Sequence, residues 1–108
     1  MNRPLLLFAC ALLLSACFGP KPIIARVNLH APDRKDDAYI LVADVHNEAG
    51  GEGEISLAAK LTNRKSGQTY RAEKKVHLGP DETTIVTLRI EAPLGDYATE
   101  ASTEYPPR

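Results

Sequence analysis

The sequence is poor in the residues on which many binding sites depend. Tryptophan is absent, and aromatic residues make up 6% of the 108 residues. In many binding proteins, exposed aromatic rings stack against sugars and nucleobases, and this chain has few aromatic residues for such stacking. Lys and Arg together number 13 against 14 Asp and Glu, and no stretch gathers the cations into a basic stripe. Nucleic acid is therefore a poor candidate partner.

The chain also lacks a hydrophobic run long enough to span a bilayer. The apolar run Leu5–Leu14 has 10 residues, whereas a spanning helix needs roughly 20. A buried N-terminal helix would show polar positions every third or fourth residue, and none occurs in this run before Ser15. The run follows Arg3, as the core of a secretory signal peptide does. We therefore expect residues 1–16 to be a signal peptide.

The residues that close this run resemble the lipobox of bacterial lipoproteins. They read Leu14-Ser15-Ala16-Cys17 and match the expected residue types, with small residues before the cut. The resemblance implies cleavage before Cys17, diacylglycerol on its thiol, and a fatty acid such as palmitate on its new amino group. A plain secretory cut is the alternative. Phe18 stands where Asp would imply the inner membrane, so the resemblance implies anchoring in the outer membrane of a host that has one.

Lipidation of Cys17 limits the chemistry of the mature chain. Cys10 leaves with the leader, so the 92 residues that remain after the first 16 are removed hold one cysteine, with its thiol blocked. That leaves no internal disulfide and no thiol nucleophile. Outside the leader, the serines are Ser56, Ser66 and Ser102, and none lies in a Gly-flanked nucleophile elbow. We therefore expect a non-catalytic protein that holds no cofactor.

From residue 23 onward the sequence alternates as β-strands do. The clearest run is 54–62, where every second residue is apolar. Clusters of Gly, Pro, Asn and Asp separate the runs and predict turns. The predicted strands cover 23–30, 39–46, 54–62, 69–78, 84–91 and 96–105. Six short strands at this spacing predict an all-β fold, an antiparallel immunoglobulin-like β-sandwich.

The predicted parts of the chain follow from these boundaries. They are a signal peptide (1–16), the lipidated cysteine with a short linker (17–22), the β-sandwich domain (23–105) and a tail (106–108). The two prolines of the linker disfavour helix, and its five residues after the cysteine span at most about 16–18 Å. We therefore expect the domain to lie close to the membrane surface. The adjacent Lys74 and Lys75 indicate an edge strand, because lysines protect open sheet edges.

Three stretches carry a family resemblance. Residues 45–50 (VHNEAG) end a strand, residues 78–83 (LGPDET) precede one, and residues 93–97 (PLGDY) begin the last. Together they resemble the small immunoglobulin-like sandwiches of bacterial envelope proteins, of the cell-adhesion-related and FxLYD kinds. That resemblance implies adhesion, scaffolding or protein contact, and it supplies no catalytic residue. Tyr97 stands where the tyrosine corner of such a fold would lie.

A possible partner surface emerges from the second predicted strand. If the odd-numbered side chains of 39–46 form the core, Ile40 and Val42 must point the other way. Ile85 is expected on the same face, with Ile24 as a further candidate. Two interpretations stay open: a central strand covered by neighbouring side chains, or an apolar patch for a partner protein, which a monomer would otherwise avoid.

A metal site is the alternative hypothesis. Asp44 and His46 lie two residues apart and share a strand face, and His30 ends the preceding strand. Histidine and aspartate on strands are ligands for zinc or copper. Polar residues on a solvated face fit the same pattern. The sequence thus favours an envelope lipoprotein that acts by protein contact, bound to membrane lipid through Cys17 and to another envelope protein. A metal- or small-ligand-binding periplasmic lipoprotein comes second and an enzyme third.

Overall fold

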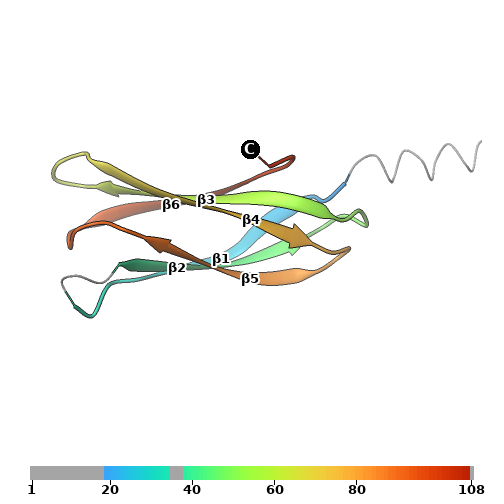
Figure 1. The fold of residues 1–108 in the computed structure, drawn as a ribbon, viewed down its shortest axis with the longest axis horizontal. Coiled ribbons are helices and arrows are strands. Elements are labelled where there is room, and N and C mark those ends of the chain that lie inside the picture. The colour runs from blue at the N-terminus through green and yellow to red at the C-terminus, as the bar shows by residue number, and fades with distance from the viewer. Residues whose placement is uncertain (1–18, 35–37, 108) are drawn as a thin grey trace, which may run out of the picture.

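The computed structural model describes residues 19–34 and 38–107. Within these residues it contains six strands and no helix, so nothing described there could cross a membrane as a helix (Figure 1). The strands are β1 (Pro22–His30), β2 (Tyr39–Asn47), β3 (Gly53–Asn63), β4 (Thr69–Leu78), β5 (Thr83–Ile90) and β6 (Tyr97–Glu104). The predicted signal peptide and the predicted lipid attachment residue, Cys17, lie outside the described residues.

The strands form two three-stranded antiparallel sheets that pack face to face. One sheet has the order β1-β2-β5 and the other the order β4-β3-β6. This confirms the predicted all-β sandwich. The order also follows the immunoglobulin scheme, with β1, β2 and β5 in the places of strands A, B and E and with β3 and β6 in those of C and F. No strand follows β6 in the described part of the chain, so β6 forms one edge of its sheet.

The predicted strand boundaries agree with the structure to within one residue at every end. The alternation that predicted them is the alternation between core and solvent, most regular in β2. The inner faces of β2 and β3 supply most of the core. Its buried members are Tyr39, Leu41, Ala43, Val45, Ile55, Leu57, Ala59, Leu61, Leu78, Val86, Leu88, Ile90 and Tyr97. The described residues include no cysteine, so no disulfide joins them. Burial of these apolar side chains is therefore their main stabilising contribution.

Asn47 joins three separate segments at one end of the sandwich. Its side chain is fully buried. Its Oδ1 accepts hydrogen bonds from the backbone N–H of Lys21 (2.9 Å) and of Ala49 (3.0 Å). Its Nδ2 donates to the carbonyl oxygens of Gly51 and Gly79, both at 2.8 Å. The side chain therefore ties the start of the domain, the β2–β3 turn and the β4–β5 turn together.

The described residues before β1 pack against the rest of the sandwich. Gly19 and Pro20 are buried, and β1 begins at Pro22, so part of the predicted linker 17–22 belongs to the packed domain. Gly19 has φ of 62°, and a Cβ there would collide with the ring of Tyr105. Only glycine combines this backbone conformation with so close a contact. The first described residues are thus packed against the last ones, 86 positions away in the chain.

Ile24, the further candidate for the outer face, lies on the inner face. The pairing of β1 with β2 shifts between Ile24 and Arg26, so Ala25 is an extra residue without a partner. An extra residue of this kind reverses the faces on either side of it. Ile24 therefore lies opposite Val45 and packs against the core.

Tyr97 anchors the turn that leads into β6. Its hydroxyl donates to the carbonyl oxygen of Pro93 at 2.5 Å, four residues upstream, which is the contact of a tyrosine corner. Its ring lies edge-on to the rings of Tyr39 and Tyr70, with centroids 5.2 and 5.9 Å away. Burial raises the pKa of Tyr97 above its usual value. Three of the four tyrosines thus pack against one another at one end of the core.

Candidate functional site

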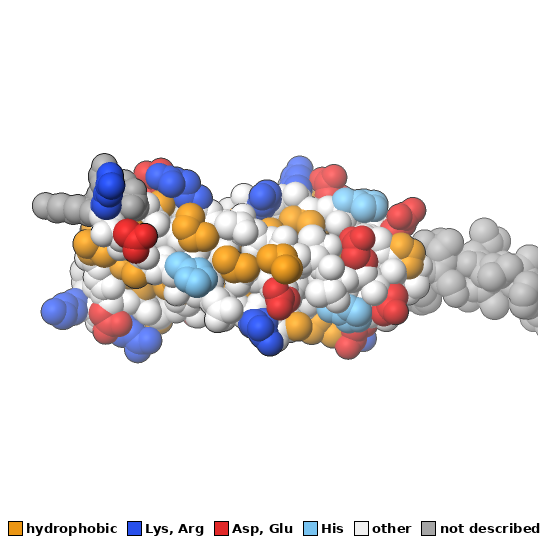
Figure 2. Space-filling model, turned by 90° about the horizontal axis from the view of Figure 1, so that it is seen from below, with side chains coloured by type: hydrophobic (Ala, Val, Ile, Leu, Met, Phe, Trp, Pro, Cys, Tyr) orange, Lys and Arg blue, Asp and Glu red, His pale blue; other side chains and the backbone are white. Residues whose placement is uncertain are grey.

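The three residues predicted as a partner patch lie on one outer face. Ile40 and Val42 project from the central strand β2, away from the core, and both are half-buried. Ile85 lies on β5 opposite Asp44, diagonal to Val42, and is 70% exposed. Figure 2 looks onto this sheet and shows hydrophobic side chains gathered along its middle. We call Ile40, Val42 and Ile85 the apolar strip.

The different exposures within the strip follow from strand order. β2 has a neighbour on both sides, so its outer side chains are flanked by those of β1 and β5. This accounts for the half-burial of Ile40 and Val42 and matches the interpretation of a covered central strand. β5 is an edge strand, so Ile85 has a flanking strand on one side only. The covered-strand interpretation therefore does not extend to Ile85.

Polar and charged residues border the apolar strip. At one end, Ile40 lies between His30 on β1 and Arg89 on β5. Beyond Val42, the next outward position of β2 is Asp44. A strip of apolar side chains with a charged and polar rim has the composition that protein-binding surfaces show.

The structure does not bring the predicted metal ligands together. His30 is paired with Ile40, whereas His46 lies six residues further along β2, a separation of roughly 20 Å at the strand rise. His46 instead has Nδ1 2.8 Å from the hydroxyl of Thr83 and Nε2 3.4 Å from a carboxylate oxygen of Asp81. Within the described part of the chain, no three His, Cys, Asp or Glu side chains are arranged to hold a metal ion.

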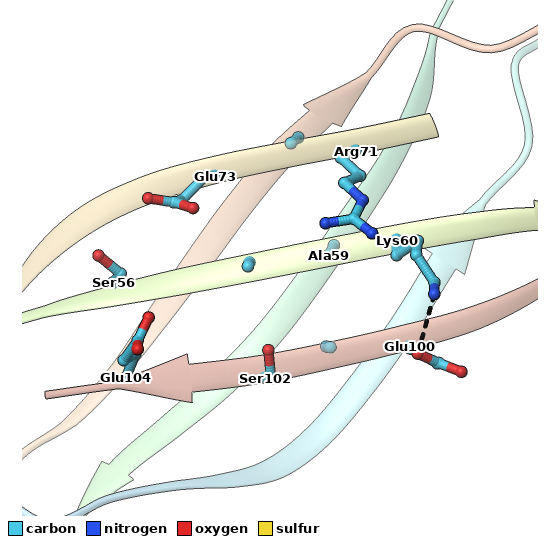
Figure 3. A pocket seen from close by; sticks show the side chains of 11 residues that line it. Ser56, Ala59, Lys60, Arg71, Glu73, Glu100, Ser102 and Glu104 are labelled. Carbon is cyan, nitrogen blue, oxygen red and sulfur yellow. Dashed lines mark ion pairs between the residues drawn. The ribbon is translucent and has the colours of Figure 1, made fainter. Parts of the chain in front are cut away.

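The other sheet carries a surface feature that the sequence reasoning missed. A groove of about 580 Å³ runs over the outer face of the β4-β3-β6 sheet. Its floor includes Ser56 and Ala58, small outward residues of β3. Figure 3 shows Arg71 and Lys60 toward one end of the groove, and Glu73 toward the other. The signal in the sequence was the run of small outward residues in 54–62, which exposes the sheet backbone between longer side chains.

The groove walls come from both edge strands. Lys60 forms an ion pair with Glu100 of β6, with 3.8 Å between Nζ and Oε2. The walls therefore carry both positive and negative charges, and the floor includes one small polar residue and one small apolar residue. This face differs in kind from the face that carries the apolar strip, where the central positions are branched aliphatic residues.

Comparison with known proteins adds no assignment to these surfaces. No protein-family model matches the chain, and no curated protein matches it significantly in sequence.

Proposed function

We propose that this chain is a lipid-anchored protein of the cell envelope, non-catalytic, which acts by protein–protein contact through the apolar strip. The observation that carries the proposal is the 70% exposure of Ile85 beside the half-buried Ile40 and Val42. Burial of apolar area of this kind favours association by roughly 25 cal/mol per Å² removed from water. An assembly accessory, an adaptor or an adhesion-type module would each use such a surface.

The anchor in this proposal is Cys17, held in the outer membrane by its acyl chains. One acyl chain gives only marginal binding to a bilayer, and two or three on one cysteine give stable attachment. Gly19 is buried in the domain, so a lipid on Cys17 would be two residue steps from packed structure, at most about 7 Å of chain. The largest possible distance between the bilayer and the domain would then be shorter than with a free linker through residue 22.

Cell fractionation tests the anchor. The full chain should be found in the membrane fraction, and the Cys17→Ser variant should be soluble, because the variant has no thiol to receive diacylglycerol. The matched control is Cys10→Ser, which changes the other cysteine and should stay in membranes. A Cys17→Ser chain that stays wholly in membranes would overturn the anchor.

Crosslinking in cells tests the contact surface. We expect the full chain to give a discrete adduct that is lost with Val42→Glu, which places a charge in the apolar strip. Thr62→Glu is the matched control, because Thr62 occupies an outward position near the end of the other central strand. Adducts of equal yield in both variants would remove the apolar strip as the contact surface.

A further inference from the structure

The two edges of the β4-β3-β6 sheet are protected to different degrees. On β4, Lys74 lies opposite the core residue Leu57, so a charge occupies an inward position, and Lys75 follows it. An inward charge of this kind blocks the addition of another strand. β6 contains no Lys, Arg, Pro or Gly, and it pairs with β3 from Tyr97 to Glu104 without a shift in register. Its outer edge is therefore straight, regular and without an inward charge.

The sequence of β6 is close to symmetric about Ala101. Reading outward from Ala101, threonine occurs two residues away on each side, at Thr99 and Thr103. Both threonines belong to the inward phase, since they lie opposite Leu61 and Leu57 of β3. A strand with this symmetry can pair antiparallel with a second copy of itself and keep like faces together.

One register of such self-pairing keeps the glutamates from lying directly opposite each other. With Ala101 opposite Ala101 of the second copy, Thr99 lies opposite Thr103, Glu100 opposite Ser102, and Glu104 opposite Ala98. Thr–Thr pairs across strands are favourable, and no glutamate faces another directly. Glu100 is in addition paired with Lys60 of its own chain.

The neighbouring registers are worse for identifiable reasons. Centring the pair on Glu100 places that residue opposite its own copy, and centring it on Ser102 places Glu100 opposite Glu104. Like charges directly opposite each other are destabilising. A shift by a single residue puts inward side chains opposite outward ones. Registers centred on Thr99 or Thr103 also keep the glutamates apart, but they pair fewer residues of β6. The register centred on Ala101 is therefore the longest one without directly opposed glutamates.

We infer that β6 is a self-association edge, through which two copies of this chain join their β4-β3-β6 sheets into one antiparallel six-stranded sheet. The occupant of the edge is a second copy of the chain, because the near-symmetric sequence of β6 lets it pair with itself, like faces together, without directly opposed glutamates. This contact is separate from the apolar strip, which lies on the other sheet, and it does not depend on the function proposed for that strip.

A register-specific disulfide tests the inference in the full chain. Directly opposed residues of antiparallel strands have Cα atoms about 4.5–5.5 Å apart, within the range that a disulfide spans. Ala101→Cys should therefore form a disulfide-linked dimer under mild oxidation. Ala72→Cys is the matched control, because Ala72 and Ala101 are the two neighbours of Ala59 on opposite edges. We expect Ala101→Cys to give at least about tenfold more dimer, since only that edge accepts a strand.

Two further variants complete the test. Thr99→Lys, added to Ala101→Cys, gives β6 the inward charge that β4 carries and should lower the dimer yield at least about tenfold. Val42→Glu, on the other sheet, should leave the yield unchanged, so a failure of the apolar strip is distinguishable from a failure of this edge. The chain without an added cysteine must give no dimer band, which controls for Cys10 and Cys17. Equal yields from Ala101→Cys and Ala72→Cys would overturn the inference.

Should Ala101→Cys fail to fold, sedimentation of the unsubstituted full chain in detergent decides the question. A dimer that Thr99→Lys converts to monomer supports the inference, because Thr99 is exposed and tolerates the change. If the chain stays monomeric at all concentrations up to about 100 µM, its self-association is weaker than that of typical specific protein contacts, and the inference is contradicted.

Discussion

The central strands β2 and β3 are built alike toward the core and differently toward solvent. Inward, each presents aliphatic residues at alternate positions. Outward, β2 presents Ile40 and Val42, whereas β3 presents Ser56 and Ala58. The core requires the inward pattern on both strands, but it places no such demand on the outward positions. Ile40 and Val42 are partly covered by the neighbouring strands, but Ile85, on the edge strand β5, is 70% exposed. Packing within the sandwich therefore does not explain Ile85, and its position beside Ile40 and Val42 is the physical basis for the proposed contact face.

The inward equivalence predicts the largest effects. Leu41 and Leu57 are both fully buried, one on each central strand. Replacing either with alanine should lower the free energy of unfolding by about 2–5 kcal/mol, because a cavity is left that the surroundings fill only in part. Urea unfolding followed by circular dichroism measures both losses. A loss below about 1 kcal/mol for one of them would show that the two inner faces are not equivalent.

The strand ends give the next effect, and here the two strands differ. Each ends in asparagine. Asn47 is fully buried with hydrogen bonds to three segments, whereas Asn63 is half-buried and its Oδ1 accepts hydrogen bonds from the N–H groups of Lys65 and Ser66 in its own turn. Asn47→Ala should destabilise the fold by more than about 2 kcal/mol, since four part-buried backbone groups lose a partner at once. Asn63→Ala should cost about 1 kcal/mol or less, because the two backbone N–H groups that lose a partner are exposed to water. Equal losses in urea unfolding would contradict the distinction.

The outward positions should have little effect on stability. Ile85→Thr should change the free energy of unfolding by less than about 0.5 kcal/mol, because the side chain is mostly exposed and threonine suits a strand. Val86→Thr, at the buried neighbouring position, is the matched control and should cost more than about 1 kcal/mol, since a hydroxyl enters the core. If Ile85→Thr proved as costly as Val86→Thr, Ile85 would be a packing residue and not part of a contact face.

The smallest effect concerns the β4–β5 turn, where the chain passes from one sheet to the other. The pKa of Glu82 lies below its usual value, because its carboxylate accepts hydrogen bonds from the Gly79 N–H and then from the Thr84 hydroxyl. A lowered pKa stabilises the fold above the carboxyl's unfolded value, about 4.3, and this contribution is lost as pH falls through the folded value. Glu82→Gln should therefore lower the urea midpoint at neutral pH and bring it close to that of the unsubstituted chain at about pH 3.

Glu54→Gln controls for the general loss of a negative charge. Glu54 is exposed, and no hydrogen bond joins its carboxylate to the described residues. At neutral pH its substitution should leave the urea midpoint close to that of the unsubstituted chain. A Glu82→Gln effect that does not shrink on acidification would show that the turn is held by something other than the ionised carboxylate.

Features set by neighbouring residues could be predicted from the sequence, whereas features set by contacts between distant segments could not. Strand positions were predicted closely because alternation is a local property. The face of Ile24 could not be assigned from alternation, because a single extra residue, Ala25, reverses it, and only the pairing with β2 reveals this. Burial of Gly19 depends on Tyr105 at the far end of the chain. The connections of Asn47 span three segments, so its strand-ending pattern predicted a turn but not the role of its side chain.

The candidate surfaces divide in the same way. Ile40 and Val42 could be assigned to one face from β2 alone, and Ile85 joined them because β5 pairs with β2 in the phase that alternation indicated. The separation of His30 from His46 depends on the direction and register of the β1–β2 pair, which no local pattern specifies. The groove needs β6, which is distant in the chain, to lie beside the consecutive strands β3 and β4.

The most direct test of the central claim compares the two outer faces within one chain. A photoactivatable amino acid is placed at position 85, within the apolar strip, or at position 73, on the wall of the groove, in the full chain in cells. The account predicts a discrete adduct with one partner from position 85, lost when Val42→Glu is added, and at least about tenfold less from position 73, because a buried apolar centre dominates contact energy. Equal adducts from both positions, or an adduct from position 85 that Val42→Glu leaves unchanged, would contradict the claim.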